Sequence, residues 1–201
     1  MILSPAPILS FWFGDSLEQG WPAQSRNKLW FRADAAVDAE IEDRFGALVE
    51  QALMGELVEW EAKPLSRLAL IILLDQFPRN IWRGTARAFA GDHRAVTLTS
   101  EGLATGMAEK LPWIGQVFFC MPLMHAEDID LQNLSVDCFR RMVNSAPPEI
   151  AGGLRDNLDF AIEHRDIIQR FGRFPYRNNV LGRSNTPDER VYLVDGARYG
   201  Q

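Results

Sequence analysis

The amino-acid sequence predicts an all-α fold, a bundle or an array of antiparallel helix pairs, forming a single domain over residues 1–201. Apolar residues recur at steps of three and four along several segments, which is the period of a helix with one buried face. Short connections join these segments, and consecutive helices with short connections pack as antiparallel pairs. No run alternates between apolar and polar residues, so we predict no β-sheet.

The composition fits one globular domain and excludes several classes of partner. Of 201 residues, 47% are hydrophobic and 24% charged, which is enough apolar surface for a core. The formal net charge of −6 argues against general binding of nucleic acid or anionic membranes, since both depend on positive charge. No run approaches the ~20 apolar residues of a membrane span, and residues 1–15 lack the basic leader of a secretory signal. We expect a cytoplasmic protein, and the sequence leaves its oligomeric state open.

The N-terminal region predicts one helix followed by a loop. The helix is expected to run from Ser4, whose hydroxyl can cap free amides, to about Phe13. Residues 15–28 contain few apolar anchors and predict a loop. After this loop, Trp30 and Phe31 are expected to fill the core.

Two helices of different character are expected next. The first begins at the cap candidate Asp34 and ends near Gly55, with apolar residues at helical spacing. The second follows Pro64 and includes residues 68–74, which are apolar on every side. A helix that is apolar all round must be surrounded by others, so we place this one at the centre of the fold.

The remaining segments are amphipathic and separated by turn signals. We predict helices at about 91–105, 112–123, 126–143 and 149–171. A last short helix should open at Thr186, where Glu189 completes a capping box, and end near Asp195.

A first group of polar residues directly follows the central apolar helix. A buried carboxylate at Asp75 is costly unless it is paired, and Arg79 is the expected partner, although Pro78 interrupts the helix between them. Such a pair could simply fix the kink. The candidate binding residues here are Asp75, Gln76, Arg79, Asn80 and Arg83.

A second group lies around His125. On one continuous helix, His125, Asp128 and Gln132 would share a face, and Asp128 could orient the imidazole for acid–base catalysis. Alternatively, His125 and Asp128 only cap the first turn of the following helix. We retain both interpretations, with His125 and Asp128 as the candidate catalytic residues.

A third group lies at the end of the last long helix. His164 has apolar neighbours at helical spacing and is expected to face the core, while Arg173, Arg177 and Asn178 crowd the loop that follows. Together Arg79, Arg83, Arg173 and Arg177, here called the motif arginines, would suit a carboxylate or phosphate if their loops meet. Otherwise they form scattered surface salt bridges.

No familiar catalytic or cofactor motif is present. The sequence lacks a Gly-rich phosphate loop, a His-Glu-x-x-His helix, a nucleophile elbow and a Cys-x-x-Cys pair. Asp75, His125, Asp128 and His164 lack the spacing that is diagnostic of metal ligands. We therefore predict neither a metal site nor a cofactor.

The motifs resemble a known bacterial family, the domain of unknown function 924. The resemblance rests on residues 8–14 (ILSFWFG), 74–80 (LDQFPRN) and 170–175 (RFGRFP). It implies a tetratricopeptide-repeat-like α-α superhelix and carries no assigned activity. Where the family pattern typically has Glu-His-Ser-Glu, Met124 and Ala126 flank the histidine here, and Tyr176 replaces a usual histidine.

Three hypotheses on function follow from these groups. The first is a protein that binds a small anionic molecule or a peptide terminus in a cleft lined by arginine, asparagine and histidine. The second is a hydrolase or transferase that uses His125 with Asp128 as acid and base. The third gives the polar motifs a structural role only, as ion-pair networks that hold loops against the core.

Overall fold

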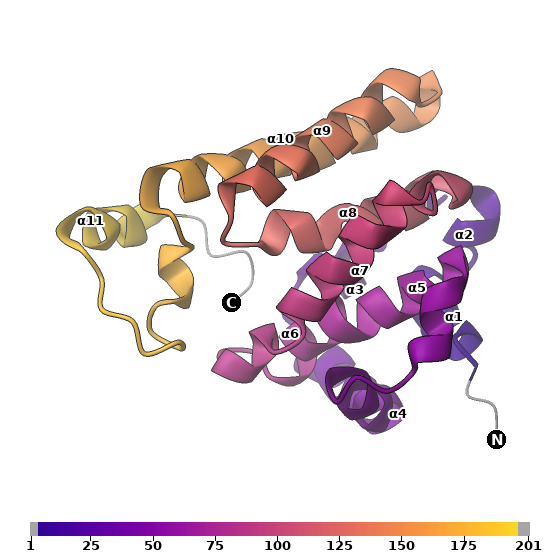
Figure 1. Cartoon of the computed structure of the whole chain (residues 1–201), viewed down its shortest axis with the longest axis horizontal. Helices are drawn as coiled ribbons and strands as arrows, with labels where there is room; N and C mark the ends of the chain where they lie inside the picture. Colours follow the sequence, from indigo (N-terminus) through magenta and orange to yellow (C-terminus); the bar gives the residue numbers. More distant parts are fainter. Residues whose placement is uncertain (1–3, 197–201) are drawn as a thin grey trace.

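The chain folds into α-helices joined mostly by short turns (Figure 1). The computed structural model describes residues 4–196, and this part of the chain contains no β-strand. The all-α prediction is therefore confirmed. The tetratricopeptide-repeat-like superhelix remains a prediction.

The N-terminal third confirms some predicted helix ends and corrects others. Asp34 caps its helix, because one carboxylate oxygen accepts hydrogen bonds from the amides of Ala36 and Val37. The predicted loop over residues 15–28 is wrong in part, since it includes the short helix α2 (Ser16–Gln19) and the start of α3 (Asn27–Phe31). Phe31 is 52% exposed and does not fill the core. The elements here are α1 (Ala6–Phe13), α2 (Ser16–Gln19), α3 (Asn27–Phe31) and α4 (Ala35–Leu53).

The central apolar helix is buried as predicted, and it is interrupted by a π-helical turn. It consists of α5 (Pro64–Ile71), the π turn η2 (Ile72–Gln76) and α6 (Phe77–Ile81). Residues 68–74 are fully buried. The amide of Phe77 donates to the carbonyl of Ile72, five residues back, as a π turn requires. Pro78 lies in the first turn of α6, where a missing amide hydrogen is tolerated.

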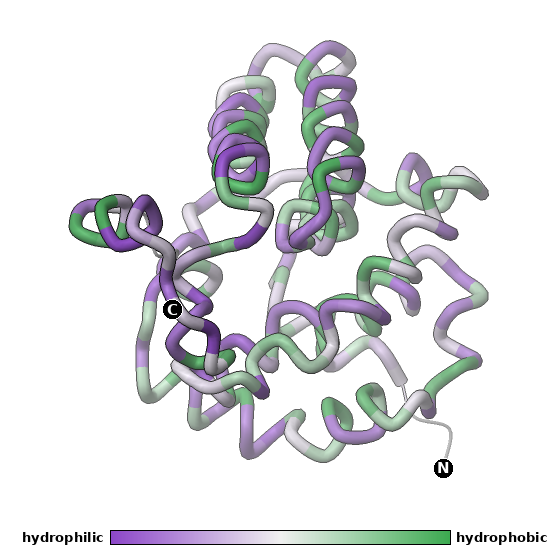
Figure 2. Tube along the Cα trace, turned by 60° about the vertical axis from the view of Figure 1, so that its left-hand side comes forward, coloured by the Kyte–Doolittle hydropathy of each residue, from purple (hydrophilic) through white to green (hydrophobic). Residues whose placement is uncertain are grey.

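The C-terminal half contains an antiparallel hairpin of two long helices. Figure 1 shows α9 and α10 side by side, with α8 between them and the N-terminal helices. In Figure 2, hydrophilic and hydrophobic residues alternate along the turns of these two helices, the pattern of helices with one buried face. The bounds are α7 (Asp92–Ala104), α8 (Trp113–His125), α9 (Ile129–Ser145), α10 (Pro148–Phe171) and α11 (Pro187–Asp195).

The core is one large connected set of buried side chains that extends from α1 to α10. A second, small set consists of Ile167, Ile168 and Phe174, at the C-terminal end of α10. The predicted capping box of α11 is confirmed, with Thr186 and Glu189 bonded reciprocally. Among the described residues, none of the helices combines the length and the apolar character that a bilayer span requires.

Candidate functional site

The fully buried carboxylate of Asp75 is the centre of the polar cluster. His125 Nδ1 lies 2.7 Å from its Oδ1, and the Gln76 amide nitrogen donates to its Oδ2 at 2.5 Å. The Arg79 guanidinium lies 3.3 Å from Oδ1. The π turn places Asp75 toward the interior, while His125 reaches it from the last turn of α8. The predicted contact between Asp75 and Arg79 is therefore present.

These contacts keep Asp75 ionised and fix the proton on His125. Burial raises the pKa of Asp75, but the charges of His125 and Arg79 and hydrogen bonds from His125 and Gln76 lower it well below its usual range. An ionised carboxylate only accepts hydrogen bonds, so Nδ1 of His125 carries the hydrogen that lies between them. Nε2, on the opposite side of the ring, has no partner among residues 4–196. When the imidazole is neutral with its hydrogen on Nδ1, Nε2 carries the free lone pair and can act as a base.

Asp128 does not orient His125, so the predicted pairing of these two residues is wrong. The Asp128 carboxylate caps α9, where it accepts hydrogen bonds from the amides of Asp130 and Leu131 at 2.9 and 3.0 Å. The helix is broken after His125, and the assumption of one shared helical face fails for that reason. The capping alternative is confirmed for Asp128.

Gln132 is buried and shapes the turn between α8 and α9. Its amide nitrogen donates to the carbonyls of Met124 and Ala126, at 2.7 and 2.8 Å, on either side of His125. Gln132 is not among the residues that line either of the pockets described below. Gln132 therefore supports the segment that carries His125.

Two motif arginines from distant segments meet at Asp92, a residue that the sequence analysis missed. Arg79 binds both carboxylate oxygens of Asp92, at 2.8 and 2.9 Å. Arg177 lies 3.4 Å from the same carboxylate and donates to the His125 carbonyl at 3.0 Å. Both guanidiniums also lie over the Phe89 ring. The loop after α10 is thereby tied to α6, α7 and the end of α8.

Asp38, on α4, is a second anchor that the sequence analysis missed. Arg83 donates to both its oxygens at 3.1 and 3.0 Å, and the Asn80 amide nitrogen donates to it at 2.8 Å. In the sequence, Asp38 and Asp92 look like ordinary acidic residues in the first turn of a helix, which the helix dipole favours. That common local role concealed their tertiary one.

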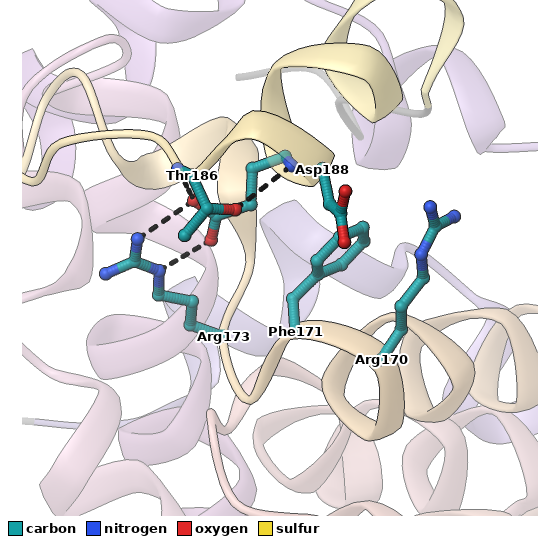
Figure 3. Close-up of a pocket in the computed structure, with 6 residues that line it drawn as sticks. Arg170, Phe171, Arg173, Thr186 and Asp188 are labelled. Atoms are coloured by element: carbon teal, nitrogen blue, oxygen red, sulfur yellow. Dashed lines mark hydrogen bonds and ion pairs between the residues drawn. The ribbon is translucent and has the colours of Figure 1, made fainter.

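Arg173 and Asn178 lie apart from this cluster, so the motif arginines do not all converge. Arg173 binds Glu189, with nitrogen–oxygen distances of 2.7 and 2.9 Å (Figure 3). This hydrogen bond and others lower the pKa of Glu189 to about 2. Asn178 is buried and donates to Asn185 and Glu189. The small pocket of about 390 Å³ in Figure 3 lies between the end of α10 and α11.

A further missed residue, Glu127, holds the same loop from the other side. Its carboxylate accepts two hydrogen bonds from Arg183, at 2.6 and 2.9 Å, and one from the amide of Phe174 at 2.8 Å. No helical spacing or motif connects Glu127 with Arg183, because the two residues are far apart in the sequence.

His164 faces the interior, as its spacing predicted, and lies beside His125. The centres of the two imidazole rings are 6.3 Å apart, and Nδ1 of His164 lies 2.7 Å from the Phe160 carbonyl. Burial, and next the neighbouring His125, lower the pKa of His164 to about 3. His164 is therefore neutral near pH 7.

A groove of about 990 Å³ opens beside this cluster. It is bounded by α3, α8, α10 and the segment from the π turn to α6. The predicted site residues that line it are Gln76, Arg79, Asn80, Arg83, His125 and His164. The side chain of His125 is 16% exposed, whereas Asp75 is sealed behind it. Within the described part of the chain, no group of three or more His, Cys, Asp or Glu is arranged to hold a metal ion.

Comparison with known proteins identifies relatives but no activity. A family model described as "Bacterial protein of unknown function (DUF924)" matches residues 8–197. A solved structure of a protein of unknown function, ATU0120 from Agrobacterium tumefaciens, is similar at 38% identity and a TM-score of 0.79. The match covers 96% of this chain and 97% of that one. No curated protein matches the chain.

Proposed function

The chain belongs to the DUF924 family of bacterial proteins of unknown function, and from that premise we propose that it is a cytoplasmic enzyme using acid–base chemistry. His125 is the acid and base, and Asp75 is its orienting carboxylate. The observation that carries the proposal is the 2.7 Å contact between Nδ1 of His125, a residue that lines the groove, and the buried carboxylate of Asp75. A histidine fixed in one tautomer by a buried carboxylate is a recurrent unit of acid–base catalysis.

The chemistry available to this pair is transfer of one proton. Nε2 of His125 takes the proton of a water molecule or a substrate hydroxyl, whose oxygen then attacks an electrophilic centre of the substrate. The leaving group takes the same proton back from Nε2, so that the histidine ends neutral. Asp75 stabilises the imidazolium between the two steps. A hydrolysis or a group transfer meets this description.

Binding of an anion by the motif arginines has weaker support. Each of these four guanidiniums already contacts a carboxylate of the protein. An anionic ligand would have to compete with Asp38, Asp92 or Glu189 for them. The ion pairs favour a structural role for these arginines, which is compatible with catalysis at His125.

Hydrolysis of chromogenic substrates tests the proposal. Purified protein would be assayed against 4-nitrophenyl esters, 4-nitrophenyl phosphate and aminoacyl 4-nitroanilides. We expect turnover of at least one class, lowered about 10²- to 10⁴-fold in His125→Asn, the usual contribution of a general base. His93→Asn is the matched control, because His93 is exposed and lies on α7, away from the groove lining.

Two results would count against the enzyme. One is the absence of turnover above that of buffer for every substrate class. The other is turnover that His125→Asn leaves equal to that of His93→Asn. Circular dichroism of both variants would establish that each is folded, so that a lost activity is not mistaken for unfolding.

A further inference from the structure

We propose that the groove binds an organic cation with an apolar body, an ammonium or guanidinium compound whose uncharged part lies against aromatic rings. The reacting group of such a substrate would face His125, a point that rests on the proposed function. The binding itself does not depend on catalysis. The ligand proposed here is positively charged, whereas the motif arginines in the sequence suggested an anion.

One wall of the groove is lined by carboxylates without protein partners. Asp156, Asp159 and Glu163 are spaced by three and four residues on α10, so they lie on one face of that helix. All three are exposed, and none of their carboxylates forms a hydrogen bond or ion pair within residues 4–196. From Asp156 to Glu163 the helix rises about 10 Å. Glu163 directly precedes His164, so this wall leads toward the two histidines.

The amide oxygens of two largely buried side chains add further acceptors. Gln76 and Asn80 are more than nine-tenths buried and line the groove. Each directs its amide nitrogen at a carboxylate, Asp75 or Asp38, which can only accept a hydrogen bond. The orientation of each amide is thereby fixed, and its oxygen has no protein partner in the described chain. Such acceptors call for a ligand that donates hydrogen bonds.

The floor of the groove suits the apolar part of a cation. Five aromatic rings, two of them about half exposed, line it together with the aliphatic Ile114 and Val117. Aromatic faces attract an ammonium or guanidinium within about 6 Å, in addition to burying its hydrocarbon. The rings are Trp21, Trp30, Phe31, Phe118 and Phe160.

The cations of the groove do not offset this acidic wall. Arg79 contacts Asp75 and Asp92, and Arg83 contacts Asp38, so their charges are balanced within the protein. Arg32 is the groove-lining cation for which the described residues provide no carboxylate partner. Three unpaired carboxylates against one unpaired guanidinium leave an excess of negative charge, which favours a cationic ligand.

Titration calorimetry with two matched probes tests the sign of the charge. 2-Phenylethylammonium and 3-phenylpropionate share an aromatic body and differ in the charge of the head group. We expect the cation to bind and the anion to bind at least about tenfold more weakly. A peptide with Lys beside Phe, added as a third probe, distinguishes a peptide source of the cation from a free amine.

Variants then locate the site. Asp159→Asn with Glu163→Gln should weaken the cation about tenfold, and added salt should reduce its affinity. Glu59→Gln, an exposed acid outside the groove, should leave it unchanged. Equal or tighter binding of 3-phenylpropionate, no binding of any cation, or no response to the double variant would overturn the proposal. Calorimetry measures binding and the chromogenic assay measures turnover, so failure of the enzyme and failure of this site are distinguishable.

Discussion

At the scale of single residues, Asp75 is the side chain on which most of the polar cluster depends. Asp75→Asn keeps the volume but removes the charge that pairs with His125 and Arg79. Breaking a buried pair by removing one partner typically costs about 3–5 kcal/mol, and we expect a loss of that order in the free energy of unfolding. Urea denaturation at pH 7 measures it.

Asp156→Asn is the control for Asp75→Asn. Asp156 is exposed on α10 and has no partner among the described residues, so its substitution should change the free energy of unfolding by less than about 0.5 kcal/mol. If both variants unfolded at the same urea concentration as the parent protein, the Asp75 cluster would not be a structural support.

His164 predicts a pH dependence of stability at the same scale. Its pKa is about 3 in the folded protein and 6.5 in the unfolded chain, so the unfolded state binds the extra proton first as the pH falls. The contribution of His164 is fully present above pH 6.5 and is lost progressively toward pH 3. The slope is at most about 1.4 kcal/mol per pH unit.

Urea denaturation of the parent protein and of His164→Leu at pH 7, 5.5 and 4.5 isolates this contribution. The carboxyls with lowered pKa values, including Glu127 and Glu189, lose their contributions at lower pH, mainly below about 4.5. The parent should lose stability faster than His164→Leu over this interval. If the free energies of unfolding of the two proteins fell in parallel with pH, His164 would bind its proton equally well in the folded and the unfolded state.

At the scale of the elements, capping and periodicity predicted the long helices because both signals are local. Asp34 and the Thr186 capping box mark helix starts through hydrogen bonds between residues that are at most three apart in the sequence. The helices α2 and α3 were missed because four or five residues are too short to show a period. The π turn at Ile72–Gln76 was missed because residues 68–74 are all apolar, which leaves helical periodicity no contrast there.

The packing of α10 against the loop before α3 gives an element-scale prediction from two adjacent glycines. A Cβ at Gly153 would lie 2.5 Å from the Trp21 ring, whereas a Cβ at Gly152 would meet no atom within 4 Å. Gly153→Ala must displace Trp21, and we expect it to cost about 1–3 kcal/mol. Gly152→Ala should be neutral or stabilise α10 by up to about 1 kcal/mol.

Thermal or urea unfolding of the two alanine variants provides the comparison. Trp21 and Gly153 both line the groove, so Gly153→Ala should also change cation binding, while Gly152→Ala should not. Equal stabilities would mean that Trp21 moves aside without cost and does not close this end of the groove.

At the scale of the whole molecule, the sequence predicted which polar residues were unusual but not which of them meet. Arg79, His125 and Arg177 come together through tertiary packing of α6, α8 and the loop after α10. Spacing describes neighbours within a helix, so it assigned His125 to Asp128 instead of Asp75, which is 50 residues away. The burial of residues 68–74 was predicted correctly, because a helix that is apolar on every side is stable only where other elements surround it.

The centre of the molecule and α11 should open independently. In α5, residues 68–71 are fully buried, whereas in α11 Val191 and Val194 are 71% and 75% exposed and only Glu189 is buried. Amides of α5 should therefore exchange with solvent deuterium only through global unfolding, and those of α11 through local opening. Native-state hydrogen exchange in low urea separates the two: exchange in α5 accelerates with urea, and exchange in α11 does not.

Arg173→Ala tests whether the ion pair with Glu189 is what holds α11 in place. Because Glu189 also closes the capping box, loss of Arg173 leaves a buried carboxylate with fewer partners at the start of the helix. Exchange should then accelerate in α11 and stay unchanged in α5. Arg140→Ala, which breaks an exposed pair with Asp137 on α9, is the matched control. Acceleration in both helices would mean that α11 unfolds together with the core and that the two do not open independently.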